Sequence, residues 1–393
     1  MEKIILIKYG ELTTKKDNRN FFIKTLVSNI ENKLNGLNYK IEKDYYRMFI
    51  YSDEIDEVLK RVSNIFGIYE IVIAYKLEDR SIDSICENAY NLLNNKEYKT
   101  FKVETNRSDK SYEVKSTMVS RLVGSYLLKN IQGKKVDVHN PDITLNVEIR
   151  KEAVYLYYES IKGLGGYPVS TLGKGLLMLS GGIDSVVAGY LTMKRGVTLD
   201  FLYFESLPHT SIEARNKVIS LRNVLNNYGN VGKLYVVNFT EIQEYIYKNM
   251  KSDYLITFMR RMMYRIAEKI AKDKKANAII NGENIGQVAS QTLTSIKAVN
   301  DVTNYPIIRP LATYDKLEII EIAKKIGSYD ISILPFIDCC TVFVPTHPVI
   351  NPNLELIKTE EEKFDFKLLD KALENVIEVD IKNNEDKKDN EYL

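Results

Sequence analysis

The chain has 393 residues, of which 45% are hydrophobic and 27% charged, and its formal net charge is +2. This length predicts two or three domains, and the small net charge excludes a strong overall field, so any nucleic-acid surface must be local. No apolar run approaches the roughly 18 residues of a membrane span, and Met1-Glu2-Lys3-Ile4 enters a strand pattern instead of a signal peptide. We therefore expect a cytoplasmic protein without a membrane segment.

Cysteine is too scarce to build a disulfide framework. The three cysteines are Cys86, Cys339 and Cys340. Because disulfide-stabilised secreted domains are rich in cysteine, this count is typical of a protein of the reducing cytoplasm.

Residues 1–166 mix short strand and helix patterns and divide into two parts. Residues 1–55 predict a small α+β domain with a helix at 19–33, whose buried face carries Phe22, Leu26 and Ile30. Its strands are expected at 3–9, 39–43 and 47–51. Residues 56–166 predict a second domain, with helices at 54–62, 81–93 and 115–131 and strands at 69–75, 99–104, 143–150 and 153–160. In the 115–131 helix, we expect one stripe formed by Met118, Leu122, Tyr126 and Lys129.

The string Gly163-Leu164-Gly165-Gly166-Tyr167-Pro168 is the clearest hinge in the chain. After it, strands and helices alternate, which predicts a doubly wound parallel sheet over residues 172–378. The expected order is 176–179, 184–194, 198–204, 212–228, 233–239, 255–272, 278–281 and 315–326. We expect the charged tail, residues 379–393, to be disordered.

Residues 180–185 read Ser-Gly-Gly-Ile-Asp-Ser and directly follow an apolar run. The pattern predicts a buried strand, a glycine-rich turn and a helix, so that backbone N–H groups and two hydroxyls lie at the positive helix end, where a phosphate binds. The spacing and lysine of a Walker A loop are absent, as is the Gly-x-Gly-x-x-Gly of a dinucleotide site. The string resembles the pyrophosphatase loop (PP-loop) of enzymes that cleave ATP to AMP and pyrophosphate. The alternative is a simple strand–helix turn with a Ser or Asp cap.

Further polar strings follow later strands of this half. Ligands of open α/β sheets bind beyond the carboxyl ends of strands, which here fall at Met178-Leu179 and Tyr203-Phe204. Arg260-Arg261 begins a helical run, residues 281–287 contain two glycines, and Asp315-Lys316 starts a later helix. Each string alone is more typical of a solvated face, a turn or a cap. Their order behind the loop indicates a nucleotide site.

These strings together resemble the tRNA 4-thiouridine synthase family (ThiI, a tRNA sulfurtransferase). The resemblance rests on Leu-Ser-Gly-Gly-Ile-Asp-Ser, Arg-Arg-Met-Met, Gly282-Glu283 with 286–293, and Arg309-Pro310-Leu311 with Asp315-Lys316. Lys8-Tyr9-Gly10-Glu11-Leu12, followed by Asn18-Arg19 and Phe22, is similar to the opening of that family. The resemblance covers about residues 1–360. It implies a ferredoxin-like N-terminal domain, a THUMP domain that binds tRNA and a PP-loop domain.

The resemblance also implies which residues contact ATP. By matching position, they are Met178, Leu179, Ser180, Gly181, Gly182, Asp184, Ser185, Tyr203, Phe204, Gly282, Gln291 and either Arg260 or Arg261. Asp184 matches a loop aspartate that organises Mg²⁺ or pyrophosphate, and Lys316 matches a lysine that acts on phosphate. The implied cofactors are ATP and Mg²⁺, and no separate protein metal site is expected.

Asp338-Cys339-Cys340-Thr341 carries the only paired cysteines. Adjacent cysteines make a poor disulfide, because their Cα atoms are ~3.8 Å apart whereas disulfides need ~4.4–6.8 Å. A metal cluster is disfavoured, since Cys86 is the only other thiol and no Cys-x-x-Cys exists. Two small buried hydrophobes would be the ordinary interpretation. The ThiI family places its sulfur-accepting cysteine in this loop, so the resemblance implies that Cys339 or Cys340 carries a persulfide.

Some family members add a rhodanese domain with a second sulfur-carrying cysteine. This chain has no cysteine after Cys340, so we expect the form without that domain. Sulfur would then arrive directly from a separate persulfide donor, or through the other cysteine of the pair.

Residues 96–135 carry an excess of basic residues over acidic ones. Such a stretch is usually a solvated helix face, but it also supplies phosphate contacts that give affinity without sequence specificity. Together with the THUMP resemblance, it predicts tRNA contacts from Lys99, Lys102, Arg107, Lys110, Lys115, Arg121, Lys129, Lys134 and Lys135.

The resemblance implies ATP-dependent thiolation of a tRNA uridine, in which O4 is adenylated and a persulfide sulfur attacks C4. It also implies a persulfide-donating cysteine desulfurase as partner and a sulfur supply for the thiazole of thiamine through a sulfur-carrier protein, and a homodimer is a candidate assembly. Two alternatives stay open. A PP-loop ligase or amidotransferase for a small molecule leaves the N-terminal 165 residues without a role. A tRNA-binding module with a structural ATP site predicts ATP binding without AMP formation.

Overall fold

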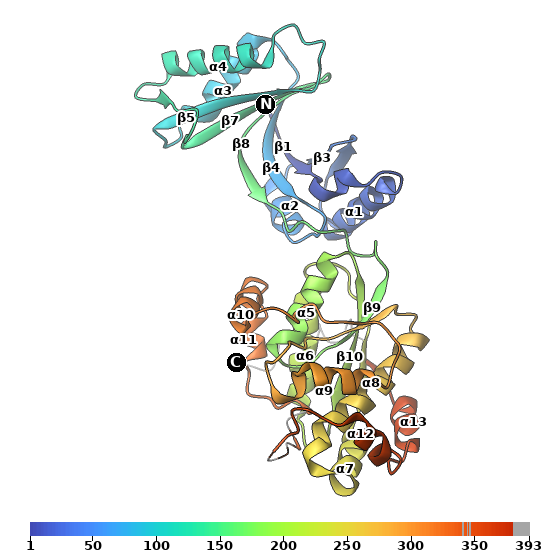
Figure 1. Ribbon diagram of the computed structural model, residues 1–393. Coiled ribbons are helices and arrows are strands. Elements are labelled where there is room, and N and C mark those ends of the chain that lie inside the picture. Colours follow the sequence, from blue (N-terminus) through green and yellow to red (C-terminus); the bar gives the residue numbers. More distant parts are fainter. Residues whose placement is uncertain (340–341, 344, 346, 380–393) are drawn as a thin grey trace, which may run out of the picture. The chain divides into compact units, whose positions relative to one another are not determined.

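The computed structural model describes residues 1–339, 342–343, 345 and 347–379. The chain divides after Gly166 into two compact units, unit 1 (Met1–Gly166) and unit 2, which begins at Tyr167 (Figure 1). The predicted tail lies outside the described residues except for Val379, which ends a strand. None of the described helices is both long and apolar enough to cross a bilayer.

Unit 1 contains one eight-stranded sheet with the order β2-β3-β1-β4-β8-β7-β5-β6. Antiparallel β4 joins β1 to β8, so the strands of both predicted N-terminal domains form one continuous sheet. In the second part, β5 pairs in parallel with β7 and β6. The strands are β1 (Glu2–Lys8), β2 (Lys40–Lys43), β3 (Arg47–Tyr51), β4 (Glu70–Leu77), β5 (Thr100–Arg107), β6 (Lys135–Val136), β7 (Ile143–Ile149) and β8 (Val154–Lys162). The domain boundary after residue 55 falls at the start of a helix and stays a prediction.

The helices of unit 1 are α1 (Arg19–Lys33), α2 (Ile55–Val62), α3 (Ile82–Leu93) and α4 (Ser116–Asn130), and a 3-10 turn, η1 (Gly10–Thr14), precedes α1. Helix α1 buries Phe22, Leu26 and Ile30, as predicted. The predicted stripe of α4 is not its buried face, because Val119, Val123 and Leu127, one position further along, face the core while Met118 and Leu122 are exposed. Both stripes have the i, i+4 spacing of a helix face, so only packing against α3 and β5 distinguishes them.

Unit 2 contains a six-stranded sheet with the order β13-β12-β9-β10-β11-β14. All neighbours are parallel except β14, which runs antiparallel to β11. Strand order runs outward in both directions from β9, so the chain switches direction between β9 and β12, where open α/β sheets bind ligands. The strands are β9 (Lys174–Met178), β10 (Thr198–Glu205), β11 (Leu234–Asn238), β12 (Ala278–Ile280), β13 (Ile307–Ile308) and β14 (Ile377–Val379).

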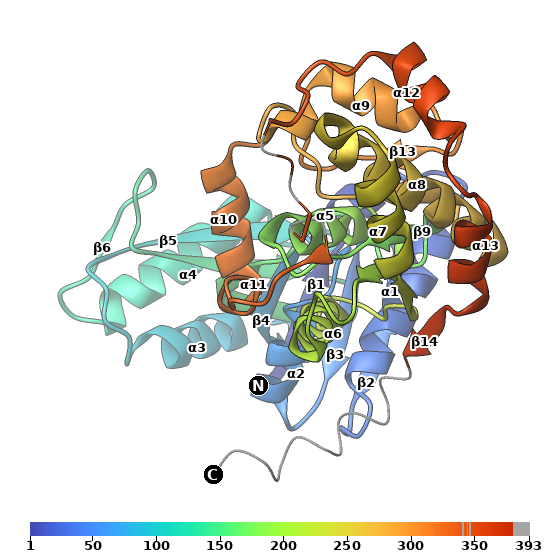
Figure 2. The ribbon, with the colours of Figure 1, turned by 90° about the horizontal axis from the view of Figure 1, so that it is seen from below.

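Helices cover both faces of this sheet, which confirms the predicted doubly wound fold. Because parallel crossovers are right-handed, α5 and α6 lie on one face, where α10 and α11 pack against them, and α8 and α9 lie on the other with α7 and α13 (Figures 1 and 2). The bounds are α5 (Ile183–Lys194), α6 (Ile212–Asn226), α7 (Thr240–Asn249), α8 (Leu255–Asp273), α9 (Leu293–Asn300), α10 (Lys316–Lys325), α11 (Tyr329–Ser332), α12 (Leu354–Glu361) and α13 (Lys367–Glu374), with 3-10 turns η2 (Ser252–Tyr254) and η3 (Ala289–Gln291).

Candidate functional site

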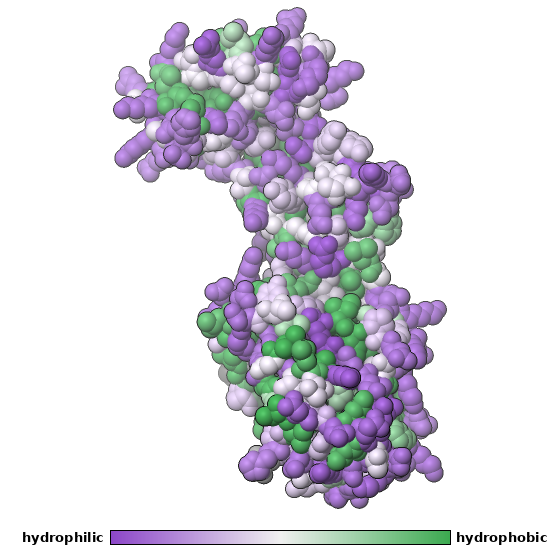
Figure 3. Space-filling model, in the orientation of Figure 1, coloured by the Kyte–Doolittle hydropathy of each residue, from purple (hydrophilic) through white to green (hydrophobic). Residues whose placement is uncertain are grey.

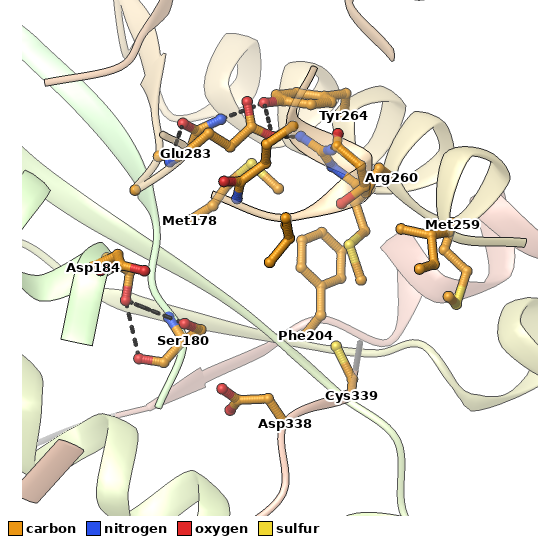
Figure 4. Close-up of a pocket in the computed structure, with 18 of the residues that line it drawn as sticks. Met178, Ser180, Asp184, Phe204, Met259, Arg260, Tyr264, Glu283, Asp338 and Cys339 are labelled. Carbon is orange, nitrogen blue, oxygen red and sulfur yellow. Dashed lines mark hydrogen bonds and ion pairs between the residues drawn. The ribbon is translucent and has the colours of Figure 1, made fainter. Parts of the chain in front are cut away.

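A cavity of about 530 Å³ lies in unit 2 where the ends of β9, β10 and β12 approach helix α8 (Figure 4). One wall is apolar and includes Phe204, Ile256, Met259 and Met263, whereas the opposite side is polar. Among the residues predicted to contact ATP, the wall includes Met178, Leu179, Ser180, Asp184, Ser185, Tyr203, Phe204, Arg260, Gly282 and Gln291. Gly181 and Gly182 lie in the adjoining loop. The cavity therefore joins an apolar surface to the predicted phosphate loop.

The loop at 180–185 is held in shape by its own serine hydroxyls. The Ser185 hydroxyl accepts the Ser180 N–H and donates to the Ser180 carbonyl, both at 3.1 Å, and Ser180 Oγ accepts the Gly182 N–H at 3.2 Å. Gly182 caps the 12-residue helix α5, whose positive end therefore faces the loop. The end of β12 comes so close that a Cβ on Gly282 would lie 2.7 Å from the Ser185 nitrogen, which only glycine permits.

Asp184 lies in the first turn of α5 and connects two other elements to the loop. Its carboxylate accepts hydrogen bonds from Lys316 Nζ at 2.6 Å and Gln287 Nε2 at 3.0 Å. The Asp184 and Lys316 side chains are 23% and 42% exposed, so both are accessible to a ligand. In the part of the chain that the structure describes, no three metal-ligating side chains gather. Mg²⁺ commonly arrives with phosphates and takes only one or two protein carboxylates, a role that Asp184 fits.

The adjacent arginines of α8 have different surroundings. Arg260 lines the cavity, pairs with Glu283 and donates to the Ser290 carbonyl. Arg261 is 1% exposed, and its Nε and Nη2 bind both carboxylate oxygens of Glu361 at 2.6 and 2.7 Å. Consecutive helix residues point about 100° apart, so the structure does not bring Arg261 into the cavity. Of the two alternatives, only Arg260 remains a candidate ATP contact.

A polar network beside Arg260 was not predicted. Glu283 accepts hydrogen bonds from Arg309 Nε at 2.6 Å and from the Tyr264 hydroxyl at 3.2 Å. Asn281 donates to the same hydroxyl, and burial raises the pKa of Tyr264, which keeps it neutral. Although Glu283 and Arg309 stand in motif strings of the sequence, nothing there shows that they pair.

Cys339 is 5% exposed, and its sulfur points into the cavity toward Phe204 (Figure 4). Its backbone carbonyl accepts a hydrogen bond from Gln243 Nε2 at 2.7 Å, and the buried Gln243 also accepts the Ser206 hydroxyl. Cys340, the other candidate sulfur carrier, lies outside the described residues. The structure thus places one predicted thiol at the edge of the predicted ATP site.

Asp338 and Lys217 are two charged residues that sequence reasoning missed. Asp338 Oδ1 accepts the N–H of Gly181, in the loop, at 3.0 Å. Lys217, on α6, is 6% exposed and donates to the Leu334 carbonyl at 2.9 Å. Burial raises the pKa of Asp338, opposed by the Gly181 hydrogen bond and the Lys217 charge. Burial lowers the pKa of Lys217, opposed by Asp338.

The basic residues predicted to contact tRNA have different surroundings in unit 1, since some are bonded within the protein and others are exposed. Arg107 donates to the Tyr112 and Val114 carbonyls, Lys134 donates to the Tyr98 carbonyl, and Lys102 pairs with Glu104 at 2.5 Å. The exposed members are Lys99, Lys110, Lys115, Arg121, Lys129 and Lys135. Hydrophilic side chains cover most of the face of this unit seen in Figure 3.

A polar cleft of about 430 Å³ in unit 1 was also missed. Lys8 and Arg47 contribute from one side, and the start of α4 contributes Ser116, Thr117 and Ser120. Hydroxyls and cations at the N-terminus of a 15-residue helix are suited to a phosphate group.

Comparison with known proteins places the chain in a family. Residues 170–366 match the family described as thiamine biosynthesis protein (ThiI), 4–72 the ThiI ferredoxin-like domain and 79–159 the THUMP domain. The probable tRNA sulfurtransferases of Thermoanaerobacter sp. (strain X514) and Clostridium acetobutylicum are 48% and 44% identical to it over 96% and 98% of this chain and 100% of their own. The crystal structure of a 4-thiouridine synthetase–RNA complex with bound ATP is similar over 96% of this chain and 99% of its own, with a TM-score of 0.88 and 34% identity. The chain therefore belongs to the ThiI family of tRNA sulfurtransferases.

Proposed function

We propose that this enzyme converts a uridine of tRNA to 4-thiouridine by adenylating O4 and then delivering sulfur from a cysteine persulfide. The observation that carries this proposal is that the Cys339 thiol and the PP-loop border one cavity. An adenylated base in that cavity would therefore lie within reach of a sulfur nucleophile. The similar structure of a 4-thiouridine synthetase with RNA and ATP supports the same assignment.

The cavity suggests how ATP binds. The adenine lies against the apolar wall near Met178, Phe204 and Met259, and the triphosphate extends to the loop at the positive end of α5. Arg260 and Lys316 supply positive charge, and Arg260 is held in place by Glu283. Asp184 orients Lys316 and, together with the phosphates, would hold Mg²⁺, which would neutralise phosphate charge.

The first step forms a bond between uridine O4 and the α-phosphorus of ATP. The bond between that phosphorus and the bridging oxygen of pyrophosphate breaks, and the N3 proton is lost from the base. Positive groups around the loop stabilise the charge that develops on the leaving pyrophosphate. The product is an O4-adenylated base, whose C4 is ready to exchange oxygen for sulfur.

In the second step, the terminal persulfide sulfur on Cys339 or Cys340 attacks C4, and AMP leaves with O4. One thiol of a dithiol reductant then attacks the cysteine sulfur and breaks the S–S bond, which leaves sulfur on the base and a mixed disulfide between the enzyme and the reductant. The second thiol of that reductant breaks the mixed disulfide, which frees the cysteine for the next cycle and leaves the reductant oxidised. The cysteine thus acts as a covalent catalyst, because it carries the sulfur atom between the donor and the base.

Unit 1 holds the tRNA in this proposal. Its exposed lysines and Arg121 contact phosphates, and the polar cleft between Lys8 and α4 accepts one phosphate group of the RNA. The target base must leave its stack to enter the cavity. A cysteine desulfurase supplies the persulfide, and the same sulfur serves the thiazole of thiamine through a carrier protein.

Mass spectrometry of nucleosides tests the proposal directly. Uridine-containing tRNA is incubated with Mg-ATP, a persulfide donor and the wild-type, Cys339→Ser or Cys340→Ser enzyme. The expected result is 4-thiouridine with the wild type and its loss in the variant that lacks the sulfur carrier, while pyrophosphate release persists. AMP formation without any thiolated base would favour a small-molecule ligase, and ATP binding without AMP would favour a tRNA-binding module.

A further inference from the structure

Residues 334–339, the cysteine segment, carry Cys339 and make polar contacts with three described parts of unit 2. Lys217 Nζ donates to the Leu334 carbonyl at 2.9 Å, Gly181 N–H donates to Asp338 Oδ1 at 3.0 Å, and Gln243 Nε2 donates to the Cys339 carbonyl at 2.7 Å. Of these three contacts, the one made by Asp338 reaches the PP-loop. Asp338 therefore connects the cysteine segment directly to the loop.

The Asp338 carboxylate is an anion at a site suited to anions. It accepts a hydrogen bond from a loop N–H at the positive end of α5, and a Cβ built on Gly181 would lie 3.0 Å from it and 3.2 Å from Lys217. The proposed function places phosphate oxygens at the same loop. A backbone N–H serves one strong acceptor at a time, and two anions at this site repel one another.

We infer that Asp338 is a positioning residue that competes with bound phosphate for the Gly181 N–H, so that phosphate binding releases the cysteine segment and exposes the Cys339 thiol. The inference rests on the proposed function, in that the loop binds the phosphates of ATP. Its consequence is an order of events, because the thiol becomes accessible to a persulfide donor only after the nucleotide has bound. That order keeps a reactive persulfide away from an empty site.

Alkylation of Cys339 by iodoacetamide tests the inference, with inorganic pyrophosphate as the probe. Pyrophosphate lacks the adenosine that the proposed function places against the apolar wall beside Cys339, so it leaves that part of the cavity open to the reagent. The full chain carries Cys340→Ser, and peptide mass spectrometry separates Cys339 from Cys86. Pyrophosphate should raise the alkylation rate of Cys339 about fivefold or more.

The Asp338→Asn variant removes the charge but keeps the shape. Its alkylation rate without pyrophosphate should already be raised, and pyrophosphate should change that rate less than twofold. Its affinity for pyrophosphate, measured by calorimetry, should rise about tenfold, since a hydrogen bond to a charged group is worth about that factor. Asp273→Asn, which changes an exposed aspartate at the end of α8, should match the parent in all three measurements.

Gln243→Met loosens the same segment without touching the loop. It should raise alkylation but leave pyrophosphate affinity and the response to pyrophosphate unchanged. Equal tightening of pyrophosphate in this variant would point to general loosening and overturn the inference. Pyrophosphate that binds the parent but leaves its alkylation rate unchanged or lower overturns it too, while the proposed function stands. If neither pyrophosphate nor ATP binds, the proposed function fails and the inference fails with it.

Discussion

The cavity of unit 2 and the basic surface of unit 1 differ in how they would recognise their ligands. In the cavity, each charged group is fixed by partners from distant parts of the chain, as Asp184 is by Lys316 and Gln287. On unit 1, the exposed cations are spread over several elements, and nothing fixes one relative to another. A site of the first kind depends on single residues, whereas a surface of the second kind depends on the sum of its charges.

The largest effect is expected from Asp184→Asn. Loss of the carboxylate frees Lys316 and removes the group proposed to hold Mg²⁺, so AMP and pyrophosphate formation should fall about 10³-fold. Release of labelled pyrophosphate measures it, and Asp273→Asn serves as control. A fall of less than tenfold would show that the cavity, like the basic surface, tolerates the loss of single charges.

Arg261→Met should destabilise unit 2 by about 3 kcal/mol, because it removes the bidentate partner of the buried Glu361 carboxylate and leaves it only the contact with Arg265 at 3.1 Å. Urea unfolding measures the change. The double variant with Glu361→Leu should recover much of the loss, since removing both charges removes the burial penalty. Arg260→Met should instead weaken ATP binding with a smaller loss of stability. If Arg261→Met weakened ATP binding and Arg260→Met destabilised the fold, Arg261 instead of Arg260 would be the ATP contact.

Combined substitution of Lys110, Lys115 and Arg121 by alanine should weaken tRNA binding about tenfold and lower the salt dependence by about two units in log–log slope, since each phosphate contact contributes ~0.7–0.9. Filter binding against increasing KCl measures both. A matched alanine triple at Lys269, Lys272 and Lys371, in unit 2, should change neither. Single substitution of Lys134, which binds a backbone carbonyl, should change tRNA affinity less than twofold. A tenfold loss from Lys134 alone would contradict the view of this surface as a sum of equivalent charges.

The smallest effect concerns pH. Burial raises the pKa of Asp338, so between the ordinary aspartate value of about 3.9 and the raised one, the folded chain holds a proton that the unfolded chain has lost. The free energy of unfolding should therefore decrease as pH rises through this window. Asp338→Asn should lack that slope in denaturant titrations at several pH values, and an unchanged slope would refute the assignment to Asp338.

The sequence predicted the part of the cavity wall that lies at the strand ends and the loop, because the positions that end parallel strands must meet at one edge of the sheet. Correct strand assignments are enough to place Met178 and Phe204 in the cavity wall, and the loop motif is enough to place Asp184 there. The choice between Arg260 and Arg261 was open, since it depends on the rotation of α8 against α12, which periodicity does not reveal.

The missed residues act through contacts between distant segments. Asp338 and Gly181 are separated by 157 positions, and Lys217 and Leu334 by 117. No local pattern records such pairs. The same holds for Lys134 and Arg107, which look like surface cations in sequence but satisfy backbone carbonyls. Composition reports that charges are present, whereas packing decides which of them face solvent.

The end of unit 2 has a consequence for synthesis on the ribosome. Helix α13 packs on α7 and α8, β14 covers the edge of β11, and Glu361 neutralises the buried Arg261. The sheet of unit 1 has all of its strands once β8, which ends at Lys162, has left the ribosome. A nascent chain that has reached residue 350 would already contain Arg261, and Asp301 at 3.6 Å from it, but not Glu361, its bidentate partner. Unit 2 therefore completes its core only after translation has passed residue 379, and until then its unfinished apolar surface and the uncovered edge of β11 are open to aggregation.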